Sequence, residues 1–139
     1  MSRTFILADF FGEASTKTTA ELATAAARIG EVTAVVLAPV GKGAAMAATV
    51  NVGPIATVIV VESADFAAHG VPAMADALSQ LVTTHSPVAV LIASHAMGKE
   101  IAGRLAVATN NGIITDAVEL PDGRYRFPLA FQVFTARNG

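Results

Sequence analysis

The sequence has 139 residues and no cysteine, and only 14% of the residues are charged, for a formal net charge of −2. The length is that of one domain, and 53% hydrophobic residues suffice for a core with two faces. The lack of cysteine excludes disulfides and thiol chemistry, and the lack of a Lys/Arg cluster argues against nucleic acid, so a protein is the expected partner.

Four short, β-branched apolar runs predict the strands of a sheet that is covered on both faces. They occupy residues 4–8, 32–38, 55–61 and 88–93, and each is continuous rather than alternating. The first run follows Met1-Ser2-Arg3 directly, which leaves no room for a signal or transit peptide. We therefore expect a cytoplasmic, bacterial protein.

The uncharged stretch at residues 43–61 is long enough to raise the question of a membrane span. Asn51, Gly53 and Pro54 interrupt it, and Val58 to Val61 are typical of a buried strand. We interpret the stretch as part of a soluble core, without membrane insertion.

Ala-rich helical runs separate the predicted strands. The first is expected at residues 18–29, with a capping box formed by Thr18 and Glu21 and a left-handed C-cap at Gly30. Pro72 opens a second helix, which ends at residues 85–87.

A third helix is expected at residues 97–110, and strands that alternate with helices indicate parallel βαβ units. The predicted fold class is α/β: a mostly parallel, open, Rossmann-like sheet in three layers, with helices on both faces. After Gly112, residues 113–120 and the alternating residues 127–133 add a C-terminal β extension. Nothing marks a second domain, so residues 1–139 are expected to form one.

The junction between the strand at 88–93 and the following helix is the candidate ligand site. Open α/β sheets bind ligands at the carboxyl ends of their strands, and helix N-termini favour anions. We therefore name a candidate switch-point anion site made of Ser94, His95, Gly98 and Lys99.

Neither common phosphate-binding motif is present at this junction. A Walker A loop would need glycine and Ser/Thr where Ala93 and Glu100 stand, and no G-x-G-x-x-G follows the first strand. A structural interpretation stays open beside the anion site: Lys99 and Glu100 as a solvated helical turn, and His95 as a hydrogen-bonded structural residue.

No catalytic or metal site is predicted. His69, His85 and His95 are far apart in the sequence and lack ligand spacing, and no nucleophile, base and orienting group can be assembled.

Several residues are candidates for a protein interface. Phe10 and Phe11 are adjacent aromatics, which cannot easily be buried in one direction. Arg104 either pairs with an acid, extends over the helix surface, or anchors a partner. Phe131 and Val133 belong to a tail strand expected at residues 124–134, whose neighbouring strand would be missing, so that self-association through an open edge is expected.

The segment SHAMGKEIAGRLAVATNNGIITDAVEL, at residues 94–120, resembles the N-terminal domain of the electron transfer flavoprotein alpha subunit. The likeness covers essentially the whole chain, with most weight on GKEIAGRLA. Further agreement comes from ILAD at 6–9, TTAELATAAARIG at 18–30, EVTAVVLA at 31–38 and IATVIVVES at 55–63.

The resemblance implies a heterodimeric electron carrier rather than an enzyme. In this family FAD is held chiefly by a C-terminal alpha domain, and a beta subunit holds AMP. Electrons pass from donors such as acyl-CoA dehydrogenases, in fatty acid beta-oxidation, to a membrane quinone reductase of the respiratory chain. The domain represented here would be the scaffold and docking part.

The chain departs from the family pattern in two places. It has Asp9-Phe10-Phe11 where the family usually has Glu-His after the first strand, and it stops at Gly139, before the FAD-binding domain. We therefore expect no cofactor bound to this chain alone. The alternative is a free-standing adenine-nucleotide-binding module of similar α/β architecture.

Overall fold

The computed structural model describes residues 3–50, 53–109, 112–115 and 129–133. Its strands are β1 (Arg3–Leu7), β2 (Phe10–Phe11), β3 (Ala14–Ser15), β4 (Glu31–Ala38), β5 (Ile55–Glu62), β6 (Ala89–Ala93), β7 (Gly112–Thr115) and β8 (Leu129–Val133). Its helices are α1 (Lys17–Ala27), α2 (Gly43–Ala48), α3 (Asp65–His69), α4 (Val71–His85) and α5 (Ala96–Thr109).

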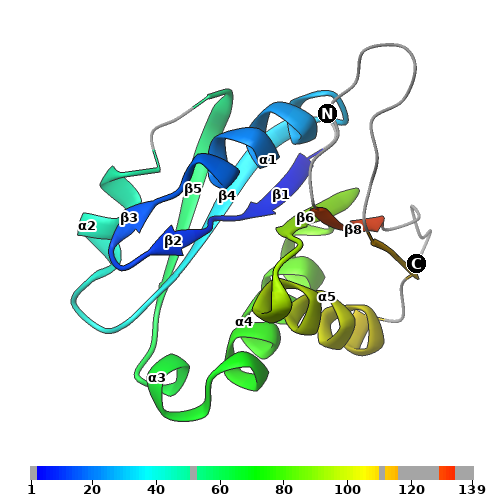
Figure 1. Cartoon of the computed structure of the whole chain (residues 1–139). Helices are drawn as coiled ribbons and strands as arrows, with labels where there is room; N and C mark the ends of the chain where they lie inside the picture. Colours follow the sequence, from blue (N-terminus) through cyan, green and yellow to red (C-terminus); the bar gives the residue numbers. More distant parts are fainter. Residues whose placement is uncertain (1–2, 51–52, 110–111, 116–128, 134–139) are drawn as a thin grey trace.

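The main sheet has six strands in the order β5-β4-β1-β6-β8-β7 (Figure 1). Strands β5, β4, β1 and β6 are parallel, whereas β8 runs antiparallel to both β6 and β7. Strands β2 and β3 form a separate short hairpin directly after β1. The predicted parallel α/β sheet and its C-terminal β extension are confirmed.

Helices cover both faces of the sheet, as the continuous apolar runs predicted. Helices α1 and α2 pack on one face, where Ile6, Leu22 and Val36 are buried in a common cluster. Helices α4 and α5 lie on the other face, where Phe5 and Leu78 belong to a second cluster. The two clusters meet through the central strands, so the fold is a three-layer α/β/α structure.

The start of α1 differs from the prediction. The helix begins at Lys17, its N-cap is Thr16, and no side chain caps it, so Thr18 and Glu21 form no capping box. The Thr16 hydroxyl instead donates to the Asp9 carboxylate. A tertiary hydrogen bond has taken the place of the local one.

The end of α1 also differs from the prediction. Gly30 does not adopt a positive φ, so it is not a left-handed C-cap. The helix ends in a tight right-handed turn, in which Arg28 and Ile29 donate their N–H groups to carbonyls three residues earlier, Ala25 and Ala26. Among the described residues, Ser86 at the end of α4 does form a left-handed cap.

The tail strand β8 does not form an edge of the sheet. Its backbone pairs with β6 on one side and β7 on the other, so the outermost strands among those described are β5 and β7 instead. The expected strand at 113–120 is described as β7 only up to Thr115. The remaining residues of both tail predictions lie outside the described part of the chain.

The uncharged stretch at 43–61 forms α2 and most of β5, within the α/β sheet. The prediction of a buried strand at Val58 to Val61 is wrong, because β5 is the outermost described strand beside β4, and Val58 and Val60 are 37% and 41% exposed. Among the described residues, no helix combines the length and the apolar character that a membrane crossing requires.

Two buried threonines provide a test of polar burial in the core. Thr33 on β4 is 1% exposed, and its hydroxyl has no hydrogen-bond partner among the described residues. We expect Thr33→Val to raise the free energy of unfolding by about 1 kcal/mol, because valine removes an unsatisfied hydroxyl at nearly constant volume. Urea unfolding followed by circular dichroism measures the change.

Thr19→Val is the matched control for this substitution. Thr19 is equally buried, but its hydroxyl accepts from Asp9 N–H and donates to Asp9 O, both at 2.9 Å. The same change should therefore lower the free energy of unfolding, by about 1–3 kcal/mol. A loss of stability in Thr33→Val as well would show that its hydroxyl is satisfied.

Candidate functional site

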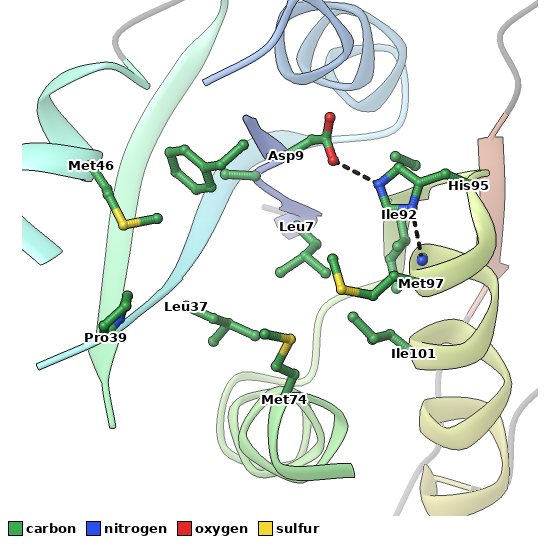
Figure 2. A pocket seen from close by; sticks show the side chains of 14 residues that line it. Leu7, Asp9, Leu37, Pro39, Met46, Met74, Ile92, His95, Met97 and Ile101 are labelled. Carbon is green, nitrogen blue, oxygen red and sulfur yellow. Dashed lines mark hydrogen bonds and ion pairs between the residues drawn. The ribbon is translucent and has the colours of Figure 1, made fainter. Parts of the chain in front are cut away.

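A pocket of about 230 Å³ opens at the carboxyl edge of the parallel sheet (Figure 2). The ends of β1, β4 and β6 form its floor, and α4 and α5 close one side. The lining residues are Leu7, Ala8, Asp9, Phe10, Leu37, Pro39, Met46, Met74, Ile92, Ala93, His95, Met97, Gly98 and Ile101.

The pocket lies at the topological switch point of the sheet. From β1 the chain crosses to β4 on one side, whereas β6 lies on the other side of β1. The loops that follow β1 and β6 therefore diverge, and the crevice between them is where open α/β sheets place ligands. The sequence predicted a site after β6, and the structure adds the end of β1.

Asp9 is the polar centre of this crevice. It follows β1, and its side chain is only 16% exposed. One carboxylate oxygen accepts from the Thr16 hydroxyl at 2.6 Å, and the other lies 2.7 Å from His95 Nε2. The Asp9 main chain also exchanges hydrogen bonds with Thr19. Asp9 thus joins the ends of β1 and β6 to the first turn of α1.

The hydrogen bonds of His95 define its tautomer. The Gly98 N–H donates to His95 Nδ1 at 3.0 Å, so Nδ1 is an acceptor and the proton resides on Nε2, which donates to Asp9. Through this bond the imidazole serves as the N-terminal cap of α5, a role more often filled by Ser, Thr, Asp or Asn. His95 is therefore a hydrogen-bonded structural residue that also borders the pocket.

Gly98 allows α5 to approach β6 closely. A Cβ atom at this position would lie 1.8 Å from the Ala93 carbonyl oxygen, so no other residue fits without movement of the backbone. The requirement for glycine comes from this contact between helix and strand. The opening turn of α5 is thus packed closely against the end of β6.

The candidate anion site is divided by the structure. His95 and Gly98 line the pocket, whereas Ser94 and Lys99 are not among its lining residues. The Gly98 N–H, which an anion at the helix N-terminus would use, is already bound to His95. Anion binding by these four residues stays a prediction, and the hydrogen bonding of Gly98 argues against it.

The pocket does not fit FAD or AMP. Its volume is below the 300–1,000 Å³ or so that is usual for ligand pockets, and a nucleotide phosphate would need cationic or N–H donors. Of the lining residues, only Asp9 carries a formal charge, and that charge is negative. No electron-transfer step is therefore assigned to this pocket.

The predicted interface residues have different environments. Phe10 lines the pocket, whereas Phe11 is 87% exposed, so the two adjacent aromatics do point in different directions. Arg104 on α5 pairs with Glu100 at 3.3 Å, which confirms the expected acidic partner. Phe131 and Val133 lie on β8, and their side chains are outside the described part of the structure.

The sequence did not reveal the role of Thr16 and Thr19. A cluster of Ser, Thr and Lys at residues 15–19 marks the start of α1, but such clusters usually serve the helix itself. Asp9, immediately after an apolar strand, was the available signal for a polar group at the switch point. Within the described ranges, no group of three or more His, Cys, Asp or Glu residues could hold a metal ion.

Comparison of the sequence with known proteins identifies the family of this chain. The family model for the electron transfer flavoprotein domain matches residues 6–133. The chain belongs to the electron transfer flavoprotein family. All lining residues of the pocket fall inside the matched segment of this electron transfer flavoprotein domain.

Relatives from two mycobacteria are similar to this electron transfer flavoprotein domain. The electron transfer flavoprotein subunit alpha of Mycobacterium tuberculosis is 35% identical, with 100% of this chain and 45% of the relative covered. That of Mycobacterium leprae is 34% identical, with 88% of this chain and 39% of the relative covered. The chain thus spans less than half the length of these relatives.

Proposed function

We propose that this domain is the N-terminal scaffold and docking domain of an electron transfer flavoprotein. It would take part in carrying electrons rather than in catalysing a reaction of its own. FAD would be held mainly by a C-terminal alpha domain and AMP by a beta subunit. Flavin dehydrogenases such as acyl-CoA dehydrogenases would be the donors, and a quinone reductase the acceptor, in the cytoplasm of a bacterium.

The exposure of Phe11 is the observation that supports docking. Phe11 lies on the β2–β3 hairpin at the carboxyl edge of the sheet and is 87% exposed. Val40 and Met97 are exposed at the same edge, at 66% and 47%. Exposed aromatic side chains with apolar neighbours are typical anchors of protein interfaces.

The alternative function, a free-standing adenine-nucleotide module, receives less support. The switch-point pocket presents the Asp9 carboxylate and no cationic side chain, and the Gly98 N–H is occupied by His95. A nucleotide phosphate would find repulsion there instead of donors.

The docking proposal is tested by changing Phe11. The chain is expressed together with the electron transfer flavoprotein beta subunit of the same organism, and binding is measured by calorimetry. Phe11→Ser should weaken binding by about 30-fold, the effect of losing an aromatic hot spot.

Val107→Ser is the matched control, because Val107 is similarly exposed, at 84%, but lies on α5 beside the α4–α5 groove. It should leave the affinity within about twofold. Equal loss in both variants, or no binding by the unaltered chain, would contradict docking through the Phe11 hairpin.

A further inference from the structure

The switch-point pocket has an almost entirely apolar wall. Three of the four methionines of the chain, Met46, Met74 and Met97, line it together with Leu37 and Ile101. Methionine side chains adapt to the shape of a ligand and make favourable sulfur contacts with aromatic rings. The wall therefore suits a small apolar body, and an aromatic ring in particular.

The polar rim of the pocket offers acceptors and no free side-chain donor. Both nitrogens of His95 are used, one toward Gly98 and the other toward Asp9. Each Asp9 oxygen accepts one hydrogen bond and retains acceptor capacity. Lys42, a cation at this edge, is paired with Glu13 at 3.4 Å and does not line the pocket.

We propose that this pocket binds a small organic amine, with a protonated nitrogen at Asp9 and a single apolar ring against the methionines. The Asp9 and His95 side chains lie together at one rim, Met97 lies beside His95, and Met46 and Met74 lie farther from Asp9, so a ligand at Asp9 can reach the methionine side chains (Figure 2). A protonated amine supplies the donor and the positive charge that the rim lacks. This inference does not depend on docking through Phe11.

Charge determines the direction of selectivity. An anion of the same shape would place its charge beside the Asp9 carboxylate, and no Lys or Arg is among the lining residues to compensate. A neutral alcohol could donate one hydrogen bond to Asp9, but this bond would lack the attraction between opposite charges that a protonated amine adds. The expected order of affinity is therefore amine, then alcohol, then carboxylate.

Three probes of similar shape test this order: 2-phenylethylamine, 2-phenylethanol and 3-phenylpropionate. Each is titrated into the full 139-residue chain carrying ¹³C-methyl methionine, and the methyl signals are followed by NMR. The amine should shift the pocket methionine signals and bind at least about tenfold more tightly than the carboxylate. Equal or tighter binding of the carboxylate, or no methyl shift with any probe, would overturn the proposal.

Two variants locate the site and its charge. Met97→Lys brings a positive charge to the rim at a half-exposed position, so amine affinity should fall at least about tenfold. Val107→Lys makes the same change on the same helix at an exposed position away from the pocket, and should leave amine affinity within about twofold. Equal losses in the two variants would refute binding in this pocket.

Asp9→Asn removes the rim charge and keeps an oxygen acceptor. The amine should then bind no more tightly than the alcohol, while alcohol binding reports that the pocket is still formed. An amine preference that persists in this variant would exclude Asp9 as the group that recognises the nitrogen.

Discussion

Replacing Gly98 by alanine is expected to lower the free energy of unfolding by about 3 kcal/mol or more. The added Cβ would lie 1.8 Å from the Ala93 carbonyl oxygen and 3.0 Å from its carbon. Both neighbours are backbone atoms of a buried strand, so they cannot rotate away. Helix α5 must move instead, which disturbs the hydrogen bond from Gly98 N–H to His95 and the pocket wall that α5 provides. Urea unfolding followed by circular dichroism gives the change.

Gly103→Ala is the matched control on the same helix. A Cβ at Gly103 meets no atom within 4 Å, and alanine favours a helix interior by about 1 kcal/mol over glycine. This variant should therefore be as stable as the unaltered chain or more stable. If both alanine variants had the same free energy of unfolding as the unaltered chain, the described close approach of α5 to β6 would be contradicted.

The layered fold could be predicted from the sequence because its signals are local and strong. The continuous apolar runs predicted β1, β4, β5 and β6, and the structure places a strand at each. The order of the strands could not be predicted in this way, because nothing in the sequence of β6 indicates that it pairs with β1 rather than with β5. That pairing creates the switch point, and the site depends on it.

The N-terminal caps of α1 and α5 show where helix-capping rules based on local sequence failed. Thr18 and Glu21 match a capping box, yet the N-cap of α1 is Thr16, two residues before Thr18, and the Thr16 hydroxyl binds Asp9 instead. At α5 an imidazole caps the helix, and this can be inferred only once Asp9 is known to hold His95. In both places, contacts between residues distant in sequence decide the local geometry.

Phe10 and Phe11 show how much a sequence pattern can state about a site. Their adjacency predicted that at least one ring would avoid the core, and Phe11 does so. The pattern could not say which of the two, because the choice depends on the β2–β3 hairpin, which has only two residues in each strand. The hairpin turns Phe10 toward the pocket and Phe11 toward solvent.

Phe5→Ala is expected to lower the free energy of unfolding by about 3–5 kcal/mol. Phe5 is fully buried on β1, the strand that joins both halves of the parallel sheet, and packs beneath α4 and α5. Its ring also meets that of His85 edge-on, with centroids 5.8 Å apart. Truncation would leave a cavity between the sheet and helices α4 and α5. The free energy of unfolding of the whole domain is expected to be about 5–15 kcal/mol, so this loss would be a large part of it. Denaturant unfolding measures the loss.

Phe11→Ala tests the same side-chain truncation where no core is involved. Because Phe11 is 87% exposed, its loss should change the free energy of unfolding by no more than about 0.5 kcal/mol. The two phenylalanines should therefore separate stability from docking: Phe5→Ala destabilises the domain, and Phe11→Ala weakens only the binding of the beta subunit. A large loss of stability in Phe11→Ala would mean that its ring packs within this domain, and the docking proposal would lose its main support.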